Sequence, residues 1–177
     1  MCGDRSRALG RLVFLAIVYT TFGLEAASAQ PTQAGCTSAP GPSAAQTLRC
    51  RDGLIIVAED GATFTLQGRN GNVNAVDLQS KALLVDAPKQ PGKSHFRVTT
   101  PQAIAAVRGT KWAVDVGQSR TSVLVLQGRV GVRRPAGAAQ VFLGPGEGVD
   151  VDPGTEPLVI KRWPQPRVDA LLARLGQ

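Results

Sequence analysis

The sequence predicts an all-β domain, either β-solenoid-like or a β-sandwich, of about ten short strands with a short C-terminal amphipathic helix. Apolar residues come in bursts of four to six between Gly, Pro, Asn and Asp, as in strands bounded by turns. The 20 glycines and 12 prolines supply many turns, and a 3.6-residue period is sustained only after residue 166. A hydrophobic content of 43% over 177 residues indicates one globular domain.

The N-terminus has the parts of an export signal. Three arginines within the first 11 residues precede the uncharged, mostly apolar run 12–24, and small residues end at Ala29. The run is shorter than the roughly 20 residues that span a bilayer. We therefore expect cleavage between Ala29 and Gln30 and a periplasmic protein with no stable membrane span, with an uncleaved anchor as the alternative.

The mature chain keeps two cysteines, Cys36 and Cys50, because Cys2 leaves with the leader. An oxidising compartment favours a disulfide between them, contributing roughly 3 kcal/mol. Two alternatives stay open: lipidation at Cys36, which follows the lipobox-like Ala34-Gly35, or two reduced structural thiols. The expected division is signal peptide 1–29, flexible lead-in 30–46, β domain 47–157, and basic linker with C-terminal helix 158–177.

The strands are expected at the apolar bursts. The Asn70-Gly71 pair is the strongest hairpin signal in the chain. In segment 111–116, large apolar residues alternate with other residues, which predicts a half-buried strand with Trp112 on its core side. Segment 122–126 shows no such alternation and should be covered on both faces. In chain order the predicted strands are 54–58, 63–67, 73–78, 82–86, 95–99, 103–107 (ambiguous by periodicity), 111–116, 122–126, 129–132, 141–143 and 147–151.

Two glycines, Gly128 and Gly146, each introduce a Val-x-Val strand. This is either a weak internal repeat of solenoid type or simply the pattern of a turn followed by a half-buried strand.

The C-terminal segment is basic and aromatic before it becomes helical. Val168, Leu171, Leu172 and Leu175 recur at helical spacing. The residues before and at the start of that pattern form a candidate partner-binding surface: Arg162, Trp163 and Arg167. Trp163 would either contact a partner or dock back on its own domain.

Residues 96–151 contain an ordered set of motifs. They are a Thr-Thr-Pro step ending at Pro101, Val-Arg-Gly-Thr at 107–110, a Thr-x-Val-x-Val-x-x-Gly-x-Val-x-Val run through Gly128, and a Pro-Gly turn at Gly146. The set resembles the FecR-type domain. The resemblance implies a periplasmic β domain that binds protein or envelope ligands and is not a catalyst. Longer members carry a cytoplasmic anti-sigma segment, for which the few residues before the apolar run leave no room, so whether a signal is relayed stays open.

The motif also has a physical reading. Gly109 sits at a corner that requires a positive φ, and the Thr110 hydroxyl would satisfy turn backbone. Arg108 would either clamp a carboxylate or phosphate of a partner or tie the corner to an acid such as Asp115.

Catalysis has little support in this sequence. His95, the one histidine, lies on the polar side of a strand, and Asp150 with Asp152 could touch a calcium ion but suits a solvated edge better. We expect no catalytic residue, no cofactor and no metal site.

The expected partner is an envelope protein, such as an outer-membrane receptor or inner-membrane regulator, bound through exposed sheet edges and loops, with strand addition as one mode. The net charge of +7 leaves an alternative open, an anionic envelope glycan or lipopolysaccharide bound by the basic tail. Nucleic acid is not expected as a partner of an exported chain.

Overall fold

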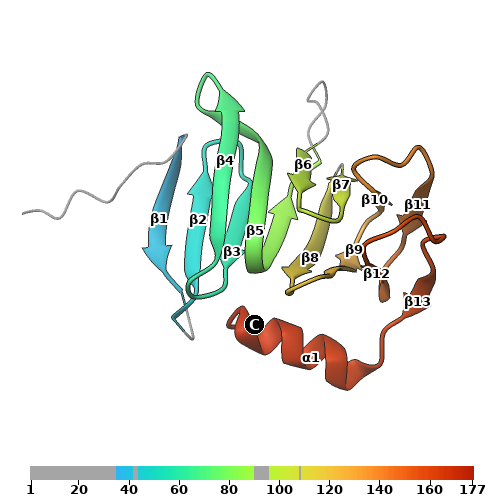
Figure 1. The fold of residues 1–177 in the computed structure, drawn as a ribbon. Helices are drawn as coiled ribbons and strands as arrows, with labels where there is room; N and C mark the ends of the chain where they lie inside the picture. Colours follow the sequence, from blue (N-terminus) through green and yellow to red (C-terminus); the bar gives the residue numbers. More distant parts are fainter. Residues whose placement is uncertain (1–34, 42–43, 90–95, 108) are drawn as a thin grey trace, which may run out of the picture.

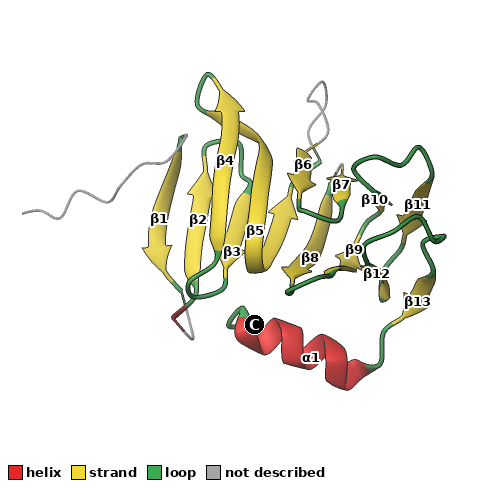
Figure 2. Ribbon diagram, in the orientation of Figure 1, coloured by secondary structure: helices red, strands yellow, loops and turns green. Residues whose placement is uncertain are grey.

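The computed structural model describes residues 35–41, 44–89, 96–107 and 109–177. Within them, thirteen strands join in one strongly curved sheet, and one helix, α1 (Gln165–Arg174), follows the last strand (Figures 1 and 2). The predicted all-β class with a C-terminal helix is confirmed. The strands are β1 (Cys36–Pro40), β2 (Gln46–Cys50), β3 (Ile55–Ala58), β4 (Thr63–Arg69), β5 (Asn72–Ala87), β6 (Phe96–Thr99), β7 (Ile104–Val107), β8 (Thr110–Val116), β9 (Thr121–Gln127), β10 (Val130–Arg133), β11 (Gln140–Leu143), β12 (Glu147–Val151) and β13 (Ile160–Arg162).

The sheet has two halves that share strand β5. Sheet A has the order β1-β2-β3-β5-β8-β9-β12-β13, and sheet B has the order β4-β5-β6-β7-β10-β11. All neighbouring pairs are antiparallel except β5 with β6. Antiparallel neighbours in two facing halves make a sandwich-like body, whereas stacked solenoid coils would pair in parallel.

Strand β5 passes from one half to the other at a bend. Its first part pairs with β4 and β6, and its second part pairs with β3 and β8. Lys81 lies at the boundary with a φ of 65°, and its ammonium group donates a hydrogen bond to the carbonyl of Asp60. Two strands predicted at 73–78 and 82–86 are therefore one strand with a left-handed residue inside it.

The main core fills the space between the two halves. Trp112 is fully buried there, which confirms its predicted core position. Sheet A contributes inward-facing residues that include Ile56, Val85, Val114, Val123 and Val149, and sheet B contributes Val76, Leu78, Val98, Val107, Val130 and Val132.

A second apolar layer lies between the outer face of sheet A and α1. Leu171 and Leu175 of the helix pack with Ala113 and Leu124 of the sheet. The prediction that β9 is covered on both faces is confirmed, since Val123 faces the main core and Leu124 faces the helix. The half-buried assignment of 111–116 is wrong at Ala113, which is fully buried because α1 covers this face.

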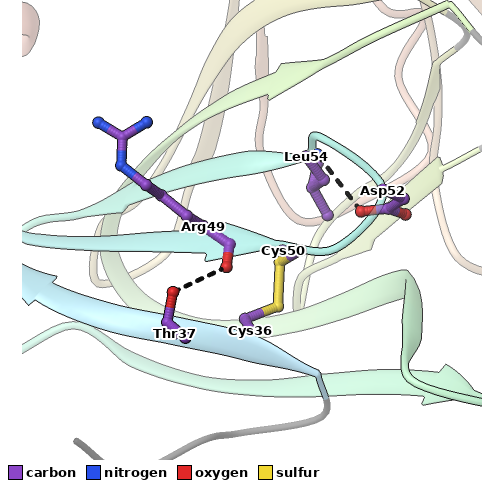
Figure 3. The surroundings of a disulfide bond; sticks show 6 residues. All are labelled: Cys36, Thr37, Arg49, Cys50, Asp52 and Leu54. Carbon is purple, nitrogen blue, oxygen red and sulfur yellow. Dashed lines mark hydrogen bonds between the residues drawn. A yellow bond between two sulfur atoms is a disulfide. The ribbon is translucent and has the colours of Figure 1, made fainter.

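The segment before the predicted β domain is more ordered than its composition indicated. Cys36–Pro40, within the expected flexible lead-in 30–46, form β1 and pair with β2, and Cys36 is disulfide-bonded to its cross-strand neighbour Cys50 (Figure 3). Strand pairing and a covalent link order a Pro- and Ser-rich segment that local propensity leaves extended and solvated. Strand β13 was likewise not predicted.

The Gly-x-Val-x-Val rhythm does not mark a structural repeat. Strand β10 lies in sheet B, and β12 lies in sheet A. Both follow a glycine with positive φ, 88° at Gly128 and 77° at Gly146, so the rhythm reflects a turn followed by a strand. The predicted hairpin at Asn70-Gly71 is present, with φ values of 54° and 75° that match the twist of the flanking strands.

Candidate functional site

Trp163 does not present an open binding platform. The side chain is 7% exposed and belongs to the apolar layer between α1 and sheet A. It lies against Gly148 of β12: a β-carbon at position 148 would stand 2.5 Å from Cε2 of the indole and 2.8 Å from the carbonyl oxygen of Val123. Of the two alternatives for Trp163, the structure has the docked one.

Arg167 fastens the start of α1 to sheet A. Its guanidinium lies 3.5 Å from the centre of the Trp163 ring and donates hydrogen bonds of 2.9 and 2.5 Å to the two carboxylate oxygens of Asp150. Ser122 also donates a hydrogen bond of 2.7 Å to Asp150. Burial raises the pKa of Asp150, but the hydrogen bonds from Arg167 and Ser122 and the nearby positive charges outweigh it, so the pKa lies below its usual value.

Arg174 fastens the other end of the helix, and sequence reasoning missed it. Its guanidinium donates to both oxygens of Asp115 at 2.9 Å and to both oxygens of Glu59 at 3.1 and 2.5 Å. The hydrogen bonds to Asp115 and then to Glu59 raise the pKa of Arg174. Arg174 follows Leu171 by three residues, so its place on the packed face of the helix was readable from the sequence.

Arg162, which was also predicted for partner binding, forms no ion pair with a described residue. Arg162 is exposed on β13 at the edge of sheet A. Arg108 lies outside the described residues, as do His95 and the cleavage site at Ala29 and Gln30. Asp115, the acid considered for Arg108, is bound by Arg174 instead.

The motif residues build turns at the ends of the strands. Gly109 has a φ of 69°, as the corner before β8 requires, and a β-carbon at Gly128 would lie 2.7 Å from its carbonyl oxygen. Thr110 is buried, and its hydroxyl forms no hydrogen bond within the described part of the chain. The Pro101 turn is closed by Thr100, whose hydroxyl accepts a 2.9 Å hydrogen bond from the Ala103 amide and lies 2.8 Å from the Thr121 hydroxyl.

The acids considered for calcium are engaged elsewhere. Asp152 accepts hydrogen bonds of 2.7 and 3.0 Å from Arg120, and Asp150 is bound by Arg167 and Ser122. Across the described ranges, no group of three or more His, Cys, Asp or Glu side chains could hold a metal ion.

An open pocket of about 510 Å³ lies among the loops that follow β6, β10 and β12. Arg134 ties two of these loops together by donating to the carbonyls of Asp152 and Glu156. Seven of the fifteen residues that line the pocket are proline or alanine, with Pro101, Pro135, Pro153 and Pro157 among them. These contacts hold the loops in place, but the described residues of the pocket do not form a set of side chains suited to a particular ligand.

The outer face of sheet B differs from that of sheet A. Phe142 of β11 is 52% exposed on it, with the guanidinium of Arg129 5.0 Å from the centre of its ring. Arg97 of β6 is also exposed there, on the side of the strand opposite the buried Phe96 and Val98. Sheet B thus has an exposed aromatic ring with arginines on its outer face, whereas Trp163 on sheet A is docked.

In the described part of the chain, no helix has the length and apolar character needed to cross a membrane.

Comparison with known proteins shows the family to which the chain belongs and the solved structures that share its fold. The family model described as FecR protein matches residues 39–131, more than half of the chain, from β1 into β10. Two crystal structures of a protein from Parabacteroides distasonis ATCC 8503, provisionally assigned as an anti-sigma factor, have a TM-score of 0.60 at 20% and 21% identity. Each comparison covers 77% of this chain and 64% of the other, so the chain spans less than two thirds of these relatives. No curated protein matches the sequence.

Proposed function

The chain belongs to the FecR family, and from this premise we propose that it is a non-catalytic periplasmic signalling module that recognises another protein of the cell envelope. The observation that carries the proposal is the extent of the family match, which takes in strands of both halves of the body. Membership supports a regulatory role. The anti-sigma assignment of the longer structural neighbours is in keeping with a regulatory circuit, although it concerns those proteins.

The chemistry of the described residues supports binding over catalysis. The best-organised carboxylates, Glu59, Asp115 and Asp150, are bound by arginines that attach α1 to sheet A. A catalytic acid or base needs access to a substrate and a pKa near the working pH. These three carboxylates instead form ion pairs that hold α1 against sheet A.

The disulfide supports the periplasmic part of the proposal. Cys36 and Cys50 are joined across β1 and β2, and such bonds persist in exported proteins. The apolar run 12–24 and the small residues ending at Ala29 would provide the export signal, with cleavage before Gln30.

The alternative is an envelope glycan or lipopolysaccharide binder that uses the basic tail. Two of the three tail residues considered for it are engaged within the fold. Trp163 is docked, and Arg167 is paired with Asp150. Of the three tail residues considered, Arg162 alone is exposed without an ion pair to a described residue.

Expression of the full chain in its native host tests the proposal. We expect the protein in the osmotic-shock fraction, with Gln30 as its first residue, and we expect chemical crosslinking to give a reproducible protein adduct. A matched variant that lacks residues 1–29 should stay in the cytosol and give no such adduct. Full-length wild-type protein found only in the cytosol, or the absence of any adduct, would contradict the proposal.

A further inference from the structure

The outer faces of sheet A and sheet B differ in what covers them. On sheet A, α1 covers Ala113 and Leu124, and its arginines bind the surrounding carboxylates. On sheet B, no described element packs against the outer face, and Phe142 is 52% exposed there. The part of sheet A under α1 is therefore closed to a partner, whereas Phe142 on sheet B is accessible.

A row of paired residues crosses sheet B on this side. Arg97 of β6 pairs with Ala106 of β7, Ala106 pairs with Gly131 of β10, and Gly131 pairs with Phe142 of β11. Strands lie about 4.8 Å apart, so the row spans roughly 14 Å. Gly131 is buried, and a β-carbon there would meet the Gln140 side-chain amide and would lie 3.2 Å from the Phe142 ring. The Phe142 ring and the Gln140 side chain therefore cover the middle of the row, and Phe142 is the exposed apolar group.

Positive charge surrounds the Phe142 ring, and no described carboxylate neutralises it. Arg97, Arg129 and Arg133 form no ion pair with any described carboxylate, and the Arg133 guanidinium donates only to the main-chain carbonyls of Arg134 and Pro135. Asp77, which lies on the same face, accepts a 2.5 Å hydrogen bond from the amide of Gln67. A partner that supplies carboxylates would complete the charge balance of this face.

We propose that the outer face of sheet B, formed by Arg97, Ala106, Arg129, Arg133, Gln140 and Phe142, is the docking surface for an acidic protein. The partner would place an apolar side chain against Phe142 and carboxylates against Arg97 and Arg129. Arginines around an exposed aromatic residue are typical of protein interfaces, whereas a polyanion would need the charges alone. The proposal rests on the proposed function and names the surface that performs it.

Photocrosslinking in the native host tests this surface with the full chain. Benzoylphenylalanine is placed at position 142 on the proposed face, at position 49 on the outer face of sheet A, or at position 160 on edge strand β13. We expect a protein adduct from position 142 and none from position 49. The pair Arg97→Glu/Arg129→Glu should lower the adduct yield at least about tenfold. The matched pair Arg49→Glu/Arg51→Glu, which changes charge equally at exposed sites away from the face, should leave it unchanged.

The outcomes separate this proposal from the broader one. An adduct from position 160 alone would keep an envelope protein partner and overturn the sheet B face, and no adduct from any position would overturn both. An adduct from position 142 within the chain itself, or one insensitive to Arg97→Glu/Arg129→Glu, would also overturn the face. Cosedimentation with purified lipopolysaccharide that depends on Arg97 and Arg129 would assign the face to a polyanion and reject the protein partner. Circular dichroism of each variant, with Arg97→Gln/Arg129→Gln as the milder pair, confirms that the variants are folded.

Discussion

The indole of Trp163 lies against Gly148 so closely that no side chain fits between the C-terminal segment and strand β12. Gly148 has no positive φ, so the glycine is required by this approach and not by its backbone conformation. The contact joins the C-terminal segment to sheet A and places Arg167 beside Asp150. The C-terminal segment is thereby part of the folded body.

Replacement of Gly148 by Ala should destabilise the protein by about 1–3 kcal/mol, because the new methyl group overlaps the indole and the carbonyl of Val123. Urea unfolding measures the loss. Tryptophan fluorescence emission should shift to longer wavelength, because Trp163 becomes exposed to solvent while Trp112 stays buried. Gly117→Ala is the control, since its β-carbon would lie 3.7 Å from its nearest neighbour. Equal stability of the two variants would refute this account of Gly148.

Arg174→Met should lower the free energy of unfolding by about 1–2 kcal/mol, because Glu59 and Asp115 lose the cation between them. The Arg174 side chain is 41% exposed, so solvent screens the pairs and the loss should shrink as salt is added. Arg162→Met removes an exposed arginine and should cost under about 0.5 kcal/mol. A combined Arg174→Met/Asp115→Asn variant should recover part of the loss. Similar losses for Arg174→Met and Arg162→Met would contradict the role of Arg174.

The pH dependence of stability should contain a contribution from Asp150. Its pKa in the folded chain lies below the ordinary value of 3.8, so the ionised form stabilises the fold at every pH above the unfolded pKa. That contribution is lost as the pH falls through the folded pKa. Asp150→Asn should therefore cost about 1 kcal/mol at pH 7 and progressively less as the pH falls through the folded pKa of Asp150.

Urea unfolding of wild type and Asp150→Asn between pH 7 and pH 2 checks this. The difference between the two curves should close at the acid end. Asp169→Asn is the control, because among the described residues that carboxylate accepts a hydrogen bond only from the Gln165 amide on the helix surface. A difference that stays constant with pH would show that ionisation of Asp150 is not the cause.

Loss of the Cys36–Cys50 disulfide, by Cys36→Ser/Cys50→Ser, should cost roughly 3 kcal/mol for its separation of 14 residues. Hydrogen exchange should become faster in β1, the strand at the edge of sheet A, while β9 in the core stays protected. Reductant should lower the stability of the wild type by a similar amount and leave the double variant unaffected. Protection of β1 that survives in the double variant would mean that strand pairing alone orders it.

Local patterns in the sequence located most of the strands correctly. Apolar bursts and Gly or Asn turns predicted the positions of β3, β4 and β6 to β12 within a few residues, because alternation and turn chemistry act between near neighbours. Strand β1 was not predicted, because its order comes from pairing with β2 and from the disulfide. The bend in β5 was not predicted either, because a lysine with a positive φ has no sequence signal.

The candidate site was predicted less well than the fold. Trp163 and Arg167 have the composition of a binding surface, yet both are used against sheet A. No sequence signal brings Phe142, Arg129 and Arg97 together, since they lie in separate segments of the chain. Exposure depends on what packs over a residue, and sequence periodicity does not report it.

By itself, then, the sequence determined the fold class, the family, the core position of Trp112 and the cysteine pair available for a disulfide. Only the tertiary structure decided that α1 covers sheet A and that the outer face of sheet B is left without a described partner. The reason is the range of the contacts: Arg174 meets Glu59 across 115 residues, and such pairings are set by how the halves of the sheet fold together. Local residue patterns specify strands and turns, whereas the choice of which face is covered is made by these distant contacts.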